Sequence, residues 1–492
     1  MGQMNFLLPP GLAADWPREL SRAYLAGGFD NAPAPLNVRL DGNQLTISRP
    51  LDESGSLIIP WDIDGAGRLM TSTSTLIEGE KPYSLALELA RGKVHQLRSH
   101  MADWRLLGFP PTEQQEEQLA ELSKAFGQTA TLESGEIDHA AHAVLRDAFR
   151  LTDELLPYYA DRLFALRHQR VPHLDTMFGC QLSALPREPG EFVDTFNSVR
   201  VPLTWREIEP AESRYNWDTS DAVVDWAIAS GLTVTAGPLI DFSRCGLPDW
   251  LSLWEGDVPN LANFMCDYIE TAVIRYRDRI KRWQLTSSCN LAGVFNLDED
   301  EMLWLTTRLA EAALQIAPEL ELVVSVAQPW GEYLAQNEHT YTPLVFLDTL
   351  FRTGLRLAAI DLEIVMGVSP RGSYCRDLLD VSRLLDHYAV LSAPIHVTLA
   401  FPSSTQPDDQ ADAELSIGTG HWKDGYSSAT QASWAESFAA IVLSKPFVVA
   451  VYWSHLSDAA PHQFPNCGLL DAGSAAKPAM ARLRKLRVDH LR

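Results

Sequence analysis

Carboxylates and a histidine recur in this sequence at or just beyond short β-rich runs, where side chains from separate segments can converge. Asp241 follows the run LTVTAGPLI, Glu332 follows LELVVSVAQPW, Glu363 lies within LAAIDLEIVMG, and His455 lies near the end of FVVAVYWSHLSD. Two carboxyl groups in one site can act as general acid and general base when their surroundings hold their pKa values apart. The preferred candidate catalytic set is therefore Glu363 with Asp241 or Glu332.

Each of these acids also has a structural interpretation. Side chains alternate along a strand, so Asp361 and Glu363 are expected to share one face and to point into the interior. Arg200 also falls at an inward position, and a buried cation needs a partner, which Asp361 or Glu363 would supply. The remaining acids have simpler alternatives: a turn cap for Asp241, a solvated first helical turn for Glu332, and a brace of the closing loop for Asp458.

The elements that must position these residues can be counted from about residue 177 onward. Eight β-rich runs alternate with helical or short connecting segments over about 300 residues, a pattern typical of a (β/α)8 TIM barrel. In such a barrel, functional side chains lie at the C-terminal ends of the strands. A doubly wound open sheet is the structural alternative, but it usually carries a glycine-rich phosphate turn, and no such turn is evident.

Two further parts precede the barrel. Residues 36–75 contain short strands, including a hairpin signal at Asp41-Gly42-Asn43 between LNVRL and QLTIS, and residues 82–172 show long helical periodicity. The expected organisation is a small β-rich unit (1–80), an α-helical section (81–172) and the barrel (173–492).

The amino-acid composition limits the classes of partner that this protein is expected to bind. The 492 residues carry a formal net charge of -24, which repels phosphate backbones and anionic lipid surfaces, so we expect neither a nucleic-acid nor a membrane partner. No signal peptide, transmembrane run or disulfide framework is evident, so we expect a cytoplasmic protein. No cofactor motif is found, and His139 and His142, one helical turn apart, lack a third ligand, so no metal is expected. The oligomeric state is left open.

Several pieces in the barrel region resemble glycoside hydrolase family 10, the endo-β-1,4-xylanases. They are, in order, VPLTWREIEPAESRYNWDTSDAVVDWAIASGL at 201–232, LPDWL at 247–251, YRDRIKRWQL at 276–285, and VVAVYWSHLSD followed by GLLDAGSAAKP near the C-terminus. The resemblance implies a barrel fold and a carbohydrate as the substrate or ligand. It also implies two glutamates about 5 Å apart, one acid/base and one nucleophile.

The residues at those positions depart from the family pattern. Ser288 stands where the resemblance places the acid/base glutamate, and Leu399 stands where it places the nucleophile. On the second strand, Arg200 and Thr204 replace a sugar-gripping glutamate and lysine, and of that motif only Trp205 remains. Retaining xylanase chemistry is therefore not expected.

Two functions from different classes remain open. In the first, the barrel binds a carbohydrate without catalysis, which the departures favour. In the second, it is an active glycosidase with relocated carboxylates, Glu363 with Asp241 or Glu332, at the spacing of about 6.5 to 9.5 Å that an inverting reaction needs. In either case the expected substrate-binding residues, at or beyond strand ends where an indole or imidazole could contact a sugar, are Trp205, Trp330, Trp422, Trp453 and His455.

Overall fold

A computed structural model gives the fold and describes residues 2–12, 15–27, 32–49, 53–133, 135–243, 245–291, 294–336 and 339–492. Eight parallel strand positions close into a barrel, because β11 pairs with both β10 and β13 and β20 pairs with both β9 and β17. The strands are β9 (Met177–Gln181), β10 (Ser198–Val201), β11 (Thr233–Ala236) continued by β12 (Ile240–Asp241), β13 (Arg282–Ser287), β14 (Glu321–Ala327), β15 (Ala359–Val365), β17 (Ile395–Ala400) and β20 (Val448–Trp453). Every β-rich run expected from the sequence contains one of these strands, which confirms the (β/α)8 TIM barrel.

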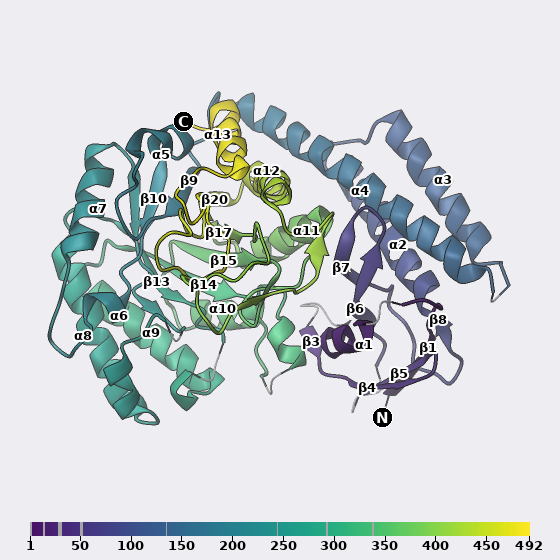
Figure 1. The fold of residues 1–492 in the computed structure, drawn as a ribbon, viewed down its shortest axis with the longest axis horizontal. Coiled ribbons are helices and arrows are strands. Elements are labelled where there is room, and N and C mark those ends of the chain that lie inside the picture. Colours follow the sequence, from purple (N-terminus) through teal and green to yellow (C-terminus); the bar gives the residue numbers. More distant parts are fainter. Residues whose placement is uncertain are drawn as a thin grey trace.

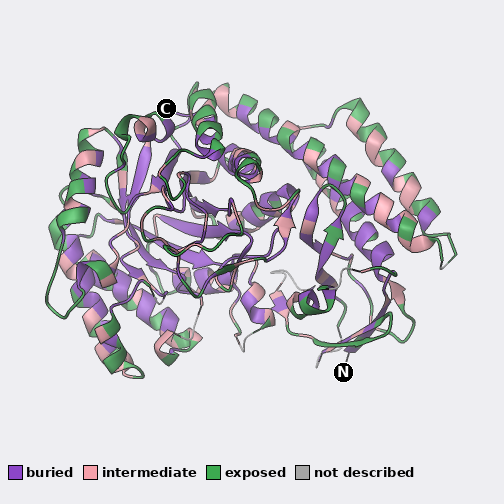
Figure 2. Ribbon diagram, viewed as in Figure 1, coloured by how far each residue is buried: buried purple, intermediate pink, exposed green. Residues whose placement is uncertain are grey.

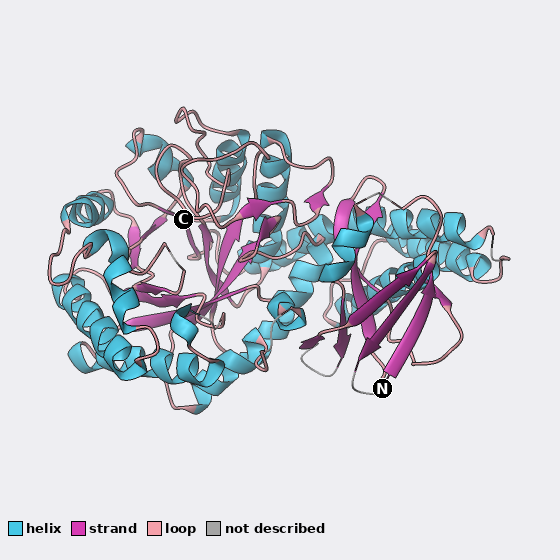
Figure 3. Cartoon of the chain, turned by 60° about the horizontal axis from the view of Figure 1, so that its bottom comes forward, coloured by secondary structure: helices cyan, strands magenta, loops and turns pink. Residues whose placement is uncertain are grey.

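Helices surround the barrel strands (Figures 1 and 3). They are α5 (Pro189–Thr195), α6 (Trp205–Ile208), α7 (Asp218–Ala229), α8 (Val258–Tyr276), α9 (Glu299–Ile316), α10 (Pro343–Arg352), α11 (Leu378–Tyr388), α12 (Ser428–Ser444) and α13 (Pro478–His490). Short 3-10 turns follow strands at η2 (Asp249–Trp254), η3 (Val294–Asn296) and η4 (Glu332–Ala335), and η5 (Ala389–Leu391) follows α11. The strands are almost wholly buried between the barrel interior and these helices (Figure 2).

The N-terminal part lies beside the barrel (Figure 3). Its strands are β1 (Gly2–Leu7), β2 (Tyr24–Gly27), β3 (Ala32–Ala34), β4 (Asn37–Asp41), β5 (Gln44–Arg49), β6 (Ser56–Ile63), β7 (Gly67–Ser72) and β8 (Tyr83–Ser84). A short helix α1 (Trp16–Glu19) and the turn η1 (Leu20–Arg22) follow β1, and the long helices are α2 (Leu85–Leu106), α3 (Glu113–Thr129) and α4 (Ile137–His168). Among the helices of the described residues, none is long and apolar enough to cross a membrane.

A loop of the barrel completes one of the N-terminal sheets. The segment between β17 and α12 contains two short strands, β18 (Ser416–Ile417) and β19 (His421–Trp422). β18 pairs with β16 (Val368–Ser369). β19 pairs with β7 and becomes the edge of the five-stranded sheet β19-β7-β6-β2-β3. The strands β7 and β19 approach each other closely at Gly67, whose φ is 107°. A Cβ atom at this position would lie 2.3 Å from the carbonyl oxygen of His421. The segment 419–427 therefore joins the barrel to the N-terminal sheet.

Candidate functional site

Glu363 is the most distinctive acidic side chain at the C-terminal end of the barrel strands. Its Oε1 accepts hydrogen bonds from the hydroxyls of Ser287 on β13 (2.7 Å) and Ser325 on β14 (2.8 Å). Only 7% of the residue is exposed. Burial raises the pKa of its carboxyl, although the charge of Arg371 and the hydrogen bond from Ser287 oppose the shift. In the described part of the chain no cation lies within ion-pair distance of Glu363, so the carboxyl is suited to carry a proton.

Asp241 lies at the end of β12. Asp241 and Ser288, which stands where the resemblance places the acid/base glutamate, both contact the guanidinium of Arg371. Arg371 approaches Asp241 Oδ1 at 3.5 Å and also donates to the hydroxyl of Ser288, which is buried and has φ of 57°. The same carboxylate accepts hydrogen bonds from the backbone N–H (3.1 Å) and the hydroxyl (2.8 Å) of Ser243. Asp241 therefore holds a loop turn, as its structural interpretation predicted, and it also faces Arg371.

Asp361 forms the ion pair that the sequence predicted for Arg200. The guanidinium Nη2 lies 3.4 Å from Asp361 Oδ2, with the two side chains 3% and 0% exposed. Arg200 also donates to Thr398 Oγ1 at 2.8 Å and stacks over the ring of Tyr452, while Thr398 in turn donates to Asp361. The prediction is confirmed for Asp361, which leaves Glu363 as the unpaired member of the two acids on β15.

Glu332 is not brought together with Glu363. Its carboxylate accepts the backbone N–H of Tyr374 (3.0 Å) and the guanidinium of Arg376 (2.7 Å), which also donates to the hydroxyl of Tyr24 on β2. The interpretation of Glu332 as a solvated first turn is therefore wrong, and its place in the catalytic set is not supported. Glu332 instead helps to fasten the barrel to the N-terminal part.

Three of the four tryptophans expected to contact a sugar are enclosed by protein. Trp205, Trp422 and Trp453 are 1%, 2% and 2% exposed. Trp205 bonds Glu209 and stacks on Tyr268, and Trp453 donates to the Cys467 carbonyl. These indoles fill the core because they pack against helices, so they offer no face for stacking in this structure. Trp330 is half-buried beneath the guanidinium of Arg376, 4.7 Å from the ring centroid.

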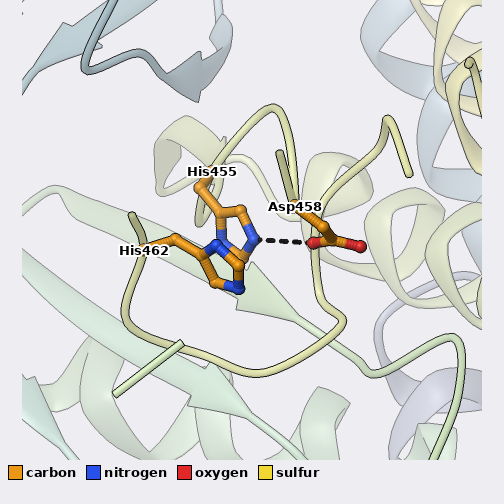
Figure 4. A group of neighbouring side chains, drawn as sticks. All are labelled: His455, Asp458 and His462. Atoms are coloured by element: carbon orange, nitrogen blue, oxygen red, sulfur yellow. Dashed lines mark hydrogen bonds and ion pairs between the residues drawn. The ribbon is translucent and has the colours of Figure 1, made fainter. Parts of the chain in front are cut away.

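His455 belongs to a closed network beyond β20 (Figure 4). Its Nε2 lies 3.1 Å from Asp458 Oδ1, and its ring stacks on that of His462 at a centroid distance of 4.2 Å. Burial lowers the pKa of His455 to about 4. Burial alone would raise the pKa of Asp458, but the hydrogen bond with His455 and the charge of Lys477 lower it well below its usual range.

The same group has the side-chain types of a metal site. Ligand atoms of His455, Asp458 and His462 all lie within 4.8 Å of one another. However, Asp458 already bonds the Lys477 ammonium at 2.5 Å and the Gly468 N–H at 2.7 Å. Because a lysine cation already neutralises the carboxylate, the residues fit a network that holds the closing loop better than they fit a divalent ion. The sequence predicted that role for Asp458 but did not single out His462 or Lys477, which come from later loop positions.

The strands define a (β/α)8-barrel protein, and part of this barrel is similar in sequence to glycosyl hydrolase family 10. The profile described as Glycosyl hydrolase family 10 matches residues 193–287. Endo-1,4-beta-xylanase B of Thermotoga neapolitana is 28% identical over 85 residues, which cover 17% of this chain and 24% of that protein. Endo-1,4-beta-xylanase B of Paenibacillus barcinonensis is 24% identical over 231 residues, which cover 45% of this chain and 67% of that protein.

Solved xylanases are among the similar structures, at low identity. Xylanase 10B from Thermotoga maritima matches with 16% identity and a TM-score of 0.47, covering 63% of this chain and 94% of that one. Xylanase 10B from Thermotoga petrophila RKU-1, solved in complex with xylobiose, matches with 17% identity and a TM-score of 0.47, covering 68% of this chain and 98% of that one. The chain thus spans about a quarter of the length of the first curated relative and most of the length of these two solved chains.

Proposed function

We propose that the barrel binds a carbohydrate at the C-terminal ends of its strands without retaining xylanase chemistry. The observation that carries this proposal is the pair of side chains at the two positions where the resemblance places glutamates. Ser288 is a buried hydroxyl bonded by Arg371, and Leu399 is a buried aliphatic side chain. A retaining displacement needs two carboxyl groups about 5 to 5.5 Å apart, one of which attacks the anomeric carbon. Neither side chain can do this.

The polar groups at the mouth support a sugar as the ligand. Glu363, Asp241 and Arg371 provide acceptors and donors close to the strand ends, and the serines beside them add hydroxyls. Sugar hydroxyls both donate and accept hydrogen bonds, so they match a site with carboxyl, guanidinium and hydroxyl groups. The similar structures from Thermotoga petrophila and Cellvibrio japonicus were solved with xylobiose and xylopentaose, which makes xylo-oligosaccharides the first ligands to test.

Calorimetric titration with xylobiose and xylopentaose tests the proposal, with reducing ends measured in the same samples. We expect saturable binding without release of reducing ends. Glu363→Gln combined with Asp241→Asn should weaken binding about tenfold or more, because two carboxyl groups that can hydrogen-bond sugar hydroxyls are lost. Glu311→Gln, an exposed carboxylate on α9, serves as the control and should leave binding unchanged. Absence of binding would refute the proposal, and so would release of reducing ends.

A second candidate function is inverting hydrolysis by Glu363 and Asp241. One observation favours it: burial raises the pKa of Glu363, which has no ion-pair partner in the residues that the structure describes, whereas Asp241, Glu332 and Asp361 each have an arginine. A carboxyl with a raised pKa is suited to protonate a leaving group at neutral pH. Hydrolysis with inverted anomeric products, lost in both Glu363→Gln and Asp241→Asn, would establish this function.

A further inference from the structure

A cavity of about 1010 Å³ lies between the N-terminal part and the barrel, apart from the carboxylates of the barrel mouth. Its N-terminal side is formed by α2, by the β6–β7 hairpin and by the hydroxyl-rich residues 71–75. Its barrel side is formed by α11 and by Trp330, and neither Glu363 nor Asp241 lines it. Figure 1 shows α11 on the side of the barrel that faces β7 and α2. The cavity is therefore a separate site.

The lining carries more cations than carboxylates although the chain as a whole is strongly acidic. The net charge of the protein is -24, yet five cationic side chains line the cavity against three carboxylates. Three of these cations pair with acids outside the lining, Arg91 with Glu88, Lys93 with Asp377 and Arg376 with Glu332, which leaves Arg98 and Arg383 as the cations with the weakest pairing. Three histidines add to the donors. The cations are Arg91, Lys93, Arg98, Arg376 and Arg383, the acids are Asp103, Asp380 and Asp386, and the histidines are His95, His100 and His387.

The cations and histidines form two rows that face one cavity. Arg91, His95 and Arg98 recur at intervals of four and three residues on α2, so they lie on one face of that helix. Arg383 and His387, four residues apart, lie on one face of α11. Arg98 has no carboxylate partner in the described residues, and Arg383 approaches Asp380 only at 3.8 Å with 44% of its side chain exposed. These guanidinium groups are available to a ligand.

The floor of the cavity holds an incompletely satisfied cation. Arg376 is buried; its Nη2 donates to Glu332 and to the Tyr24 hydroxyl, and its Nη1 lies 3.8 Å from Asp380, but its Nε has no hydrogen-bond partner among the described residues. Burial lowers the pKa of His100 to about 3, and the charges of Arg383, Lys445 and Lys93 lower it further against the opposing charge of Asp380. The buried unpaired donor of Arg376 and the guanidinium groups of Arg98 and Arg383 favour an anion.

We propose that this cavity binds a small polyhydroxylated anion, a sugar that carries a phosphate or a carboxylate group. Guanidinium groups form charge-assisted, often bidentate, hydrogen bonds with either group. The hydroxyl side chains of residues 71–75 and the half-buried Trp330 provide contacts for the sugar hydroxyls and ring. The volume is at the upper end of that of small-molecule sites. This site is independent of the carbohydrate site proposed at the barrel mouth.

Calorimetry on the 492-residue protein tests the proposal with four probes: inorganic phosphate, a hexose 6-phosphate, a hexuronate and the neutral hexose. We expect at least one of the two anionic sugars to bind and the neutral hexose not to bind. Tighter binding of the phosphate ester or of the hexuronate identifies the anionic group. Absence of binding by both anionic sugars at about 10 mM, or equal binding of the neutral hexose, would overturn the proposal.

Matched arginine substitutions locate the site. Arg383→Gln and Arg98→Gln, at exposed positions where folding is unaffected, should each weaken binding of the anionic sugar about tenfold. Arg308→Gln is the control, because Arg308 is 47% exposed and also approaches a carboxylate at 3.8 Å across one helical turn, but on α9. Equal weakening by all three variants would indicate a general charge effect and would contradict a site in this cavity.

Discussion

Removal of the cation from the barrel interior should destabilise the protein strongly. Arg200→Met keeps an apolar side chain of similar length but leaves Asp361, 0% exposed, without its ion-pair partner. Breaking a buried pair from one side costs about 3 to 5 kcal/mol. Asp361 keeps hydrogen bonds from Thr398 and Ser325, so we expect a loss near the lower end of this range.

The loss is measured by urea denaturation at pH 7, followed by tryptophan fluorescence and circular dichroism. A matched control is Arg352→Met, because Arg352 pairs with Asp348 at 2.6 Å but is 78% exposed, and surface pairs contribute about 0 to 1 kcal/mol. In the double variant Arg200→Met/Asp361→Asn, part of the loss should be recovered because no buried charge is left unpaired. A loss below about 1 kcal/mol for Arg200→Met, equal to that of the control, would refute the assigned role of this pair.

Three further variants test other parts of the structure. Glu363→Gln should stabilise the protein increasingly as the pH rises from 4 to 8. The folded-state pKa of Glu363 is raised, so its stabilising contribution is complete below its unfolded pKa of about 4.3 and is lost above it; melting temperatures with the same pH dependence in both proteins would contradict this. Gly67→Ala should destabilise by about 1 to 3 kcal/mol more than Gly65→Ala, since both glycines have positive φ but only a Cβ at Gly67 would collide with the paired strand; equal melting temperatures would show that this contact can yield. Ser288→Glu combined with Leu399→Glu should not create a xylanase, because the second-strand positions that orient a sugar remain altered; turnover of about 1 per second or faster on xylo-oligosaccharides would contradict the reasoning.

The barrel could be predicted from the sequence because each strand leaves a recognisable pattern within its own short stretch of residues. Each strand is a short β-rich run bounded by turn signals or helices, and the number and order of the runs limit the possible folds. The pairing of Arg200 with Asp361 could be predicted as well, because side-chain alternation places both in the interior, where an isolated charge is costly.

The features that could not be predicted depend on contacts between distant segments. Glu332 binds Arg376, which also donates to Tyr24 on the N-terminal strand β2, and nothing near residue 332 encodes either contact. The segment 419–427 joins the N-terminal sheet because β19 pairs with β7, about 350 residues earlier. Trp205 and Trp453 follow strands as sugar-contacting residues would, but helix packing buries them. The spacing of residues along the chain does not distinguish a buried indole from an exposed one.

The most direct test of the central claim is proton NMR of xylopentaose mixed with the protein. If the barrel binds a carbohydrate without retaining chemistry, saturation of protein signals should transfer to the sugar, and the anomeric signals should stay unchanged over time. The double variant Glu363→Gln/Asp241→Asn should show reduced transfer. New reducing-end signals that first appear with retained β configuration would contradict the account, and so would the absence of any saturation transfer.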